Sequence, residues 1–219
     1  STGLGKASIR LEDLEDTDLI IIMGQNPGTN APRMLTSLQK AKDRGAKIIA
    51  VNPLPEAGLM NFTNPNPYHY DNKLKFIITN LKNDATKIAD IHLPIRIGGD
   101  LAFLKGVLKV LVEKEKKSPM PIFDYDFINS KTEGYQDFIG ALEQIEWKTI
   151  LEQTGLAQGQ IEEVANIYLN SNRVITCWAM GITQHKQAVA TVQEIANLHF
   201  LRGQIGRQGA GLCPVRGHS

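Results

Sequence analysis

The chain has 219 residues, of which 42% are hydrophobic, so it can fold around a core of its own. Its 24 Lys and Arg nearly balance its 23 Asp and Glu, which gives no indication of nucleic acid binding or of a strongly charged partner. Two cysteines cannot build a disulfide framework or supply the about four ligands of an iron–sulfur cluster, and no apolar run approaches the ~20 residues of a membrane helix.

Both ends of the chain look internal to a longer polypeptide. The sequence does not begin with Met, no signal peptide opens it, and it stops within a glycine-rich stretch, Gly203 to Gly217. We interpret it as an internal piece of a longer protein. Because targeting signals are absent and we expect Cys177 and Cys213 to be reduced, we predict a cytoplasmic location.

The first predicted unit consists of a strand, a helix and a second strand. Residues 19–23 are a continuous apolar run, typical of a strand buried on both faces of a parallel sheet. A turn-rich loop, residues 24–30, precedes a helix from Ala31 to Gly45, with Asn30 as its N-cap. Residues 47–51 form the second strand. The unit spans about 33 residues, which is the size of a parallel crossover.

The middle of the chain is predicted to be irregular before it returns to the sheet. Residues 54–72 are rich in Pro and Asn, and residues 75–79 are a candidate short strand. Residues 90–95 form a better strand, ended by Gly98 and Gly99. Asp100 is expected to cap the following helix. Its apolar residues follow helical spacing: Leu104, Val107, Leu108, Leu111 and Val112.

The second half of the chain is predicted to be mainly helical. The expected elements are a linker at 118–122, two or three short helices within 124–154, a helix through 161–169, a strand at 173–178 and a helix at 187–202. We expect no regular element from Gly203 onward, because the tail is too rich in glycine. The chain as a whole predicts one α/β domain, residues 1–219, with a doubly wound, mostly parallel sheet and helices on both faces. The extra helices of the second half form a candidate insertion at 118–172.

Polar residues and glycines follow each of the four main strands, where open α/β sheets bind ligands. These segments are Gly24 to Asn30, Asn52, Gly98 to Asp100, and Met180 to His185. We expect them to meet in one crevice. Each also has an ordinary interpretation, since the first can be a plain strand-to-helix turn, Asp100 a helix cap and His185 an exposed loop residue.

The residues themselves suggest an anionic ligand. The loop from Gly24 to Gly28 lacks the Gly-x-Gly-x-x-Gly fingerprint, yet its backbone N–H groups can face a phosphate. The Asp100 carboxylate can accept from the N–H donors of guanine. Arg216 is either an ordinary surface arginine or a fork for a carboxylate or phosphate. A lone His185 is poor evidence for a metal, and we predict no protein-bound metal site in this chain.

One motif leads to a family resemblance. Residues 178–185 resemble the Met-Gly-x-Thr-Gln-His segment of formate dehydrogenases and related molybdopterin oxidoreductases. Residues 203–211 are similar to that family's Gly-Asn-Ile-Gly-x-x-Gly-x-Gly block, and residues 213–218 stand where a Pro-x-Arg-Gly-Gln ending is common. The first loop resembles a Gly-x-Asn-Pro turn, and Asn52 stands where Asp is commoner. The resemblance therefore covers nearly the whole chain.

The resemblance implies a Rossmann-like domain that binds one of two molybdopterin guanine dinucleotides carrying molybdenum. It places Gly24, Gln25, Asn26 and Thr29 against diphosphate and ribose, Asn52 near the ribose or guanosine, Gly99 and Asp100 beside guanine, and Met180, Gly181, Gln184 and His185 nearer the pterin. Arg216 would be catalytic beside molybdenum, with Gly217 in the cofactor set. The parent enzyme would perform a two-electron transfer on a small molecule, formate or another small anion.

The resemblance also implies what this chain does not contain. The ligand to molybdenum, any iron–sulfur cluster and the second dinucleotide site would belong to the remaining domains of the parent chain, so the fragment alone is expected to be inactive. His218 replaces the usual Gln, which puts formate itself in doubt. The electron-transfer partner is not identified by the sequence.

Three alternatives remain at this point. The first is the central domain of a thiamine-diphosphate enzyme, which also has an apolar strand and a glycine turn. The second is a non-catalytic binding module on the same fold. The third is a nicotinamide-binding domain, against which stand the missing fingerprint and the lack of Asp or Glu directly after the second strand.

Overall fold

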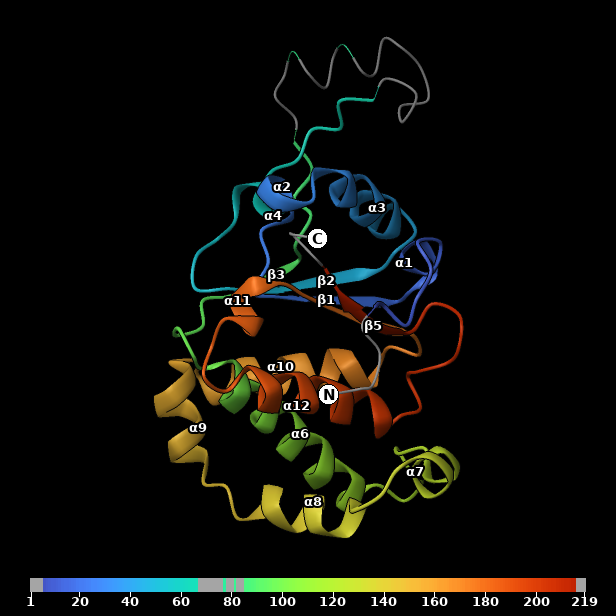
Figure 1. The fold of residues 1–219 in the computed structure, drawn as a ribbon, viewed down its shortest axis with the longest axis vertical. Helices are drawn as coiled ribbons and strands as arrows, with labels where there is room; N and C mark the ends of the chain where they lie inside the picture. The colour runs from blue at the N-terminus through green and yellow to red at the C-terminus, as the bar shows by residue number, and fades with distance from the viewer. Residues whose placement is uncertain (1–5, 67–76, 78–80, 82–84, 216–219) are drawn as a thin grey trace.

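The core of the molecule is a five-stranded sheet (Figure 1). The computed structural model describes residues 6–66, 77, 81 and 85–215. Its strands are β1 (Leu19–Met23), β2 (Lys47–Val51), β3 (Ile91–Leu93), β4 (Val174–Trp178) and β5 (Gly211–Pro214). They lie in the order β3-β2-β1-β4-β5, and every neighbouring pair is parallel. This confirms the predicted doubly wound α/β architecture.

Helices cover both faces of the sheet (Figure 1). One face carries α1 (Asp13–Asp16), α2 (Pro27–Asn30), α3 (Pro32–Asp43) and α4 (Ala57–Met60). The other carries α6 (Asp100–Lys117), α10 (Gln158–Leu169) and α12 (Ala188–Phe200), with α7 (Tyr125–Lys131), α8 (Tyr135–Glu143) and α9 (Trp147–Thr154) farther out. The three outer helices confirm the short helices expected within 124–154, while the limits of the insertion at 118–172 stay a prediction.

The central strand explains why its sequence is apolar without alternation. Leu19, Ile21 and Met23 pack into the core beneath one face. Ile20 and Ile22 pack into the core on the opposite face. Because successive side chains of a strand point to opposite faces, a strand covered on both sides must be apolar at every position.

The first helical segment differs from the prediction. The chain first makes the one-turn helix α2, in which Asn26 Oδ1 accepts from Thr29 N at 3.3 Å. The longer helix α3 begins only at Pro32, after Ala31, which makes no side-chain cap bond. Asn30 is therefore the last residue of α2 and not the cap of α3. Asn26 had the same capping chemistry and lies earlier in the loop.

Asp100 also differs from its predicted role as a helix cap. It is the first residue of α6, and Gly99 occupies the N-cap position. Gly99 O accepts the first intrahelical bond, from Phe103 N at 2.9 Å. The glycine takes this position because a Cβ there would lie 2.7 Å from Gln153 O on the neighbouring helix α9.

The glycine-rich tail contains a strand that the sequence did not predict. Residues 211–214 form β5 at the edge of the sheet, paired with β4. Gly211 has φ +149°, and a Cβ there would lie 2.5 Å from Ser8 Oγ. The close approach of the N-terminal segment thus requires glycine at position 211. Glycine has a low strand propensity, but the pairing of β5 with β4 outweighs it.

Two smaller differences concern loops. Residues 54–72 were predicted to be irregular but include the one-turn helix α4, and the loop after β4 contains the one-turn helix α11 (Met180–Thr183). The candidate strand at 75–79 falls outside the described residues, apart from Ile77. None of the described helices is long and apolar enough to cross a membrane.

Candidate functional site

Two glycines from distant parts of the sequence meet where the strand order changes direction. Gly24 follows β1 and Gly181 follows β4, and these two strands are neighbours at the centre of the sheet. Gly181 N donates to Gly24 O at 3.1 Å. A Cβ on Gly24 would lie 2.7 Å from Gly181 C, and Gly24 has φ +56°. The two backbones therefore form a surface without side chains at the carboxyl edge of the sheet, where such folds bind ligands.

Asn52 holds the loop that follows β1. Its Oδ1 accepts from Gln25 N at 3.2 Å, and its Nδ2 donates to Gln25 O at 3.0 Å. Asn52 is 2% exposed, and His92 Nε2 lies 3.0 Å from its backbone oxygen. An aspartate could not donate to Gln25 O, so this pairing explains why Asn stands where Asp is commoner in the resembling family. Both the oxygen and the nitrogen of the amide bond to the loop backbone, and they position the loop.

The Gln25 side chain presents an unpaired acceptor. Gln25 is 3% exposed, and its Nε2 donates to Met34 Sδ at 3.2 Å. Its Oε1 is the buried side-chain atom that lacks a hydrogen-bond partner among the described residues. A buried amide oxygen without a donor is costly, at about 1–3 kcal/mol. The unpaired oxygen therefore points to a donor that a ligand supplies.

A second pair of glycines brings Glu56 to the same loop. A Cβ on Gly58 of α4 would lie 2.8 Å from Gly28 Cα of α2. This contact places Glu56, the residue before α4, beside Asn26, whose Nδ2 donates to Glu56 Oε2 at 2.5 Å. The sequence analysis missed Glu56. The sequence feature that could have identified Glu56 is its position as an acidic residue in the loop that follows β2.

Asp100 and His185 connect the remaining two loops. Asp100 is 8% exposed, and burial raises the pKa of its carboxyl, against the opposing effects of its own backbone N–H and of the nearby His185. Thus the loops after β3 and β4 are close enough to interact. Asn26, Asp100 and Gln184 follow the carboxyl ends of β1, β3 and β4, with α2 and α4 on one face of the sheet and α6, which Asp100 begins, on the other (Figure 1).

The other predicted residues divide into three groups. Thr29, Met180, Gly181 and Gln184 are exposed at this edge, and His185 is partly exposed. Gly99 faces α9, so its close contact is with protein backbone. Arg216 and Gly217 lie outside the described residues, and their roles stay predictions. The last described residue, Val215, donates from its N to Trp178 O at 2.8 Å, at the carboxyl end of β4.

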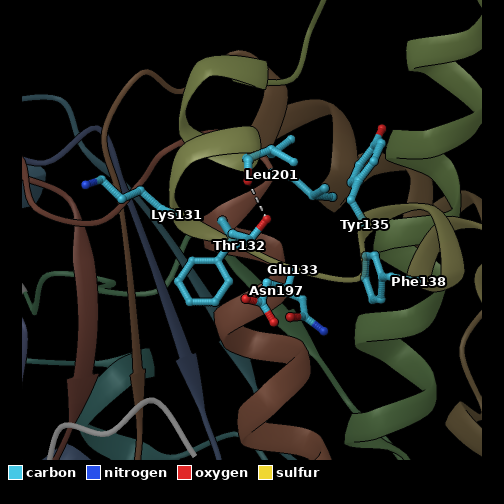
Figure 2. A pocket seen from close by; sticks show the side chains of 9 residues that line it. Lys131, Thr132, Glu133, Tyr135, Phe138, Asn197 and Leu201 are labelled. Carbon is cyan, nitrogen blue, oxygen red and sulfur yellow. Dashed lines mark hydrogen bonds between the residues drawn. The ribbon is translucent and has the colours of Figure 1, made fainter.

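A separate cavity lies away from this edge (Figure 2). It has a volume of about 370 Å³, is open to solvent and lies between α7, α8 and the end of α12, with Lys131, Tyr135, Phe138 and Asn197 among its lining residues. Asn197 is nine residues beyond the start of α12, about 14 Å along the helix axis. The cavity thus belongs to the helical layer. The described residues contain no group of three or more His, Cys, Asp or Glu arranged to hold a metal.

The fold and the site together define an α/β domain whose candidate ligand site lies at the point where the strand order changes direction. A glycine floor, an unpaired buried amide oxygen and a buried carboxylate all follow the carboxyl ends of the parallel strands. The family model for molybdopterin oxidoreductases matches residues 4–216. The chain belongs to this family. The assignment replaces the thiamine-diphosphate and nicotinamide alternatives.

Individual relatives agree with the family. The chain is 45% identical over 219 residues to an uncharacterized oxidoreductase of Mycobacterium tuberculosis, covering 100% of this chain and 27% of that protein. It is 27% identical over 219 residues to formate dehydrogenase H of Escherichia coli, covering 100% of this chain and 26% of that protein. The chain thus spans about a quarter of the length of these relatives.

A solved structure shows the same fold. Acetylene hydratase from Pelobacter acetylenicus superimposes with a TM-score of 0.72 at 18% identity, over 97% of this chain and 24% of that chain. At this identity the likeness concerns the fold alone.

Proposed function

We propose that this chain is the domain of a larger molybdenum oxidoreductase that binds one molybdopterin guanine dinucleotide. The observation that carries the proposal is that three unlike features follow the carboxyl ends of the parallel strands, at one edge of the sheet. These are the backbone floor of Gly24 and Gly181, the unpaired oxygen of Gln25 and the buried carboxylate of Asp100. These features suit the chemistry of a guanine nucleotide, because it offers N–H donors to the acceptors and carries a diphosphate that needs close approach to the backbone.

Each residue has a role suited to its position. Gly24 would allow the diphosphate to approach the backbone, with the exposed Thr29 beside it, and Gly181 would continue the backbone floor towards the pterin. Because α2 has only four residues, backbone N–H groups rather than a helix dipole would bind the phosphates. Asp100 would accept from guanine N–H groups, while Met180, Gln184 and His185 would lie towards the pterin. When bound, molybdenum and its pterin supply the two-electron chemistry.

Arg216 is the proposed catalytic residue, with Gly217 beside it in the cofactor set. Its guanidinium fork would hold an anionic substrate, formate or another small anion, and stabilise charge during transfer. The path of the described chain supports this place, since Val215 bonds to the end of β4 next to the loop of Met180.

The rim of the site supports a larger parent protein. Four large apolar side chains are exposed in or just after the loops that follow β2, β3 and β4: Leu54, Ile97, Met180 and Val189. Exposed apolar residues gathered around one site are typical of a surface that other protein or a ligand covers. The covering would come from the remaining domains of the parent chain, which also would hold any iron–sulfur cluster.

Nucleotide binding by the full-length protein prepared without cofactor tests the proposal. We expect GDP to bind at least tenfold more tightly than ADP, because adenine lacks the N–H pair that a carboxylate accepts. Asp100→Asn should remove most of this preference, whereas Asp137→Asn, an exposed aspartate of α8, should retain it. Isothermal titration calorimetry gives the six affinities, those of the three proteins for GDP and for ADP. Equal binding of GDP and ADP by the unaltered protein would contradict the proposal.

The same titration should depend on pH. Burial raises the pKa of Asp100, and only the ionised carboxylate accepts two N–H bonds. GDP affinity is therefore expected to be full above that raised pKa and to fall as the pH drops through it. The Asp100→Asn variant should show a much flatter profile. If both proteins have the same pH profile, Asp100 is not the guanine acceptor.

A further inference from the structure

The residue that usually binds the ribose is not available in this site. In dinucleotide-binding α/β domains, an acidic side chain near the end of the second strand accepts from the ribose hydroxyls. Here Asn52 follows β2, and both ends of its amide bond to the backbone of Gln25. At 2% exposure it offers nothing to a ligand. A ribose at this edge needs another acceptor.

Glu56 offers an acceptor in the same loop. It lies five residues beyond the end of β2 and is partly exposed. Its Oε2 accepts from Asn26 Nδ2 at 2.5 Å. Its Oε1 makes no hydrogen bond or ion pair within the part of the chain that the structure describes. One carboxylate oxygen is thus held in place while the other remains able to accept.

The protein fixes the position of Glu56 in advance. The backbone contact between Gly28 and Gly58 locks α4 against α2. Leu59 is fully buried, and its O accepts from Ala89 N at 2.8 Å. A carboxylate on such a rigid support loses little freedom on binding, which favours a role in recognition.

The order of the strands matches the order of groups in a guanine nucleotide. Asp100 lies beyond β3, Glu56 beyond β2 and Gly24 beyond β1, and these three strands are consecutive in the sheet. Adjacent strands are about 4.8 Å apart, so β3 and β1 are about 10 Å apart. On the proposed function, a nucleotide that reaches from Asp100 to Gly24 crosses the end of β2, the strand whose following loop carries Glu56.

We propose that the Glu56 carboxylate accepts hydrogen bonds from the 2′- and 3′-hydroxyls of the guanosine ribose, in place of Asn52. The inference rests on the proposed function and adds to it the residue that selects the ribose. It also accounts for a negative charge so close to a phosphate-binding loop. The charge faces hydroxyl donors, and Asn26 is bonded to it on the side of that loop.

The test compares GDP with 2′,3′-dideoxy-GDP in the full-length protein prepared without cofactor. The unaltered protein should bind GDP about tenfold or more tightly, as expected for hydrogen bonds to a charged acceptor. Glu56→Gln keeps an oxygen for Asn26 Nδ2 but turns an amide nitrogen towards the ribose. This variant should bind the two nucleotides within about threefold of each other. Glu163→Gln, an exposed glutamate of α10, should behave like the unaltered protein.

The outcomes separate a binding role from a structural one. If Glu56 only shapes the loop, its replacement weakens GDP and dideoxy-GDP by the same factor, and the inference is overturned. It is also overturned if the unaltered protein binds both nucleotides equally while still preferring GDP to ADP, a result that leaves the proposed function intact. If the unaltered protein binds GDP and ADP with equal affinity, both the inference and the proposed function are contradicted.

Discussion

At the scale of single residues, His199 shows how the glycine-rich segment is joined to the sheet. The ring is fully buried, with Nε2 2.8 Å from Thr176 Oγ1 and Nδ1 3.4 Å from Gln204 O. The Gln204 side chain in turn accepts from Val174 N at 3.1 Å and donates to Asn172 O at 3.0 Å. Burial lowers the pKa of His199 to about 4. The network therefore requires a neutral imidazole.

Acid should consequently destabilise the domain through His199. The unfolded chain takes up a proton near pH 6.5, whereas the folded chain takes it up only near pH 4. The stability from a neutral ring is present above 6.5 and is lost as the pH falls towards 4, by about 3 kcal/mol in the free energy of unfolding. Urea denaturation at pH 7.5 and pH 4.5 measures this loss. His199→Gln should reduce the difference between the two pH values, and an unchanged difference would assign the acid sensitivity to other groups.

At the scale of elements, the glycine pair predicts which substitutions the site tolerates. Gly24→Ala combines φ +56° with a Cβ 2.7 Å from Gly181 C, and Gly181→Ala places a Cβ 2.6 Å from Gly24 O. Each should lower the free energy of unfolding by about 2–4 kcal/mol. Gly134→Ala is the matched control, because Gly134 has φ +74° with nothing within 4 Å. It should cost about 1 kcal/mol from backbone strain alone. Equal losses in the three variants would show that backbone contact is unimportant.

The elements also show how far the sequence determines the structure. Strands β1, β2 and β4 were predictable because burial on both faces leaves a continuous apolar run. The edge strand β5 was not predictable, because its one glycine, Gly211, is required by close contact with Ser8, which lies 203 positions earlier in the chain. Among site residues, the place of Gly24, Asp100 and Met180 after the carboxyl ends of their strands followed from parallel topology, and their convergence on one ligand stays a prediction. Two features of the site were not predictable: the hydrogen bonds between the Asn52 amide and the Gln25 backbone, and the position of Glu56. Both depend on tertiary contacts that no local sequence pattern encodes.

At the scale of the whole molecule, the isolated chain is expected to fold without being active. Its sheet is buried on both faces by its own helices, so cooperative unfolding should be seen by circular dichroism. Its ligand edge keeps exposed apolar residues, including Ile97 and Val189, that nothing in the described chain covers. We therefore expect no turnover of formate or another small anion after incubation with the cofactor. Metal-dependent turnover by the isolated chain would refute this expectation.

The contact between Gly24 and Gly181 has a consequence for biosynthesis. The two residues are 157 positions apart (181 minus 24), so a ribosome must deliver almost the entire domain before they can touch. Proteins of this size fold as domains while synthesis proceeds. On the proposed function, a nascent chain that stops short of β4 lacks the backbone surface that would receive the nucleotide. Insertion of the cofactor must therefore follow translation of the second half, and truncated products should accumulate empty.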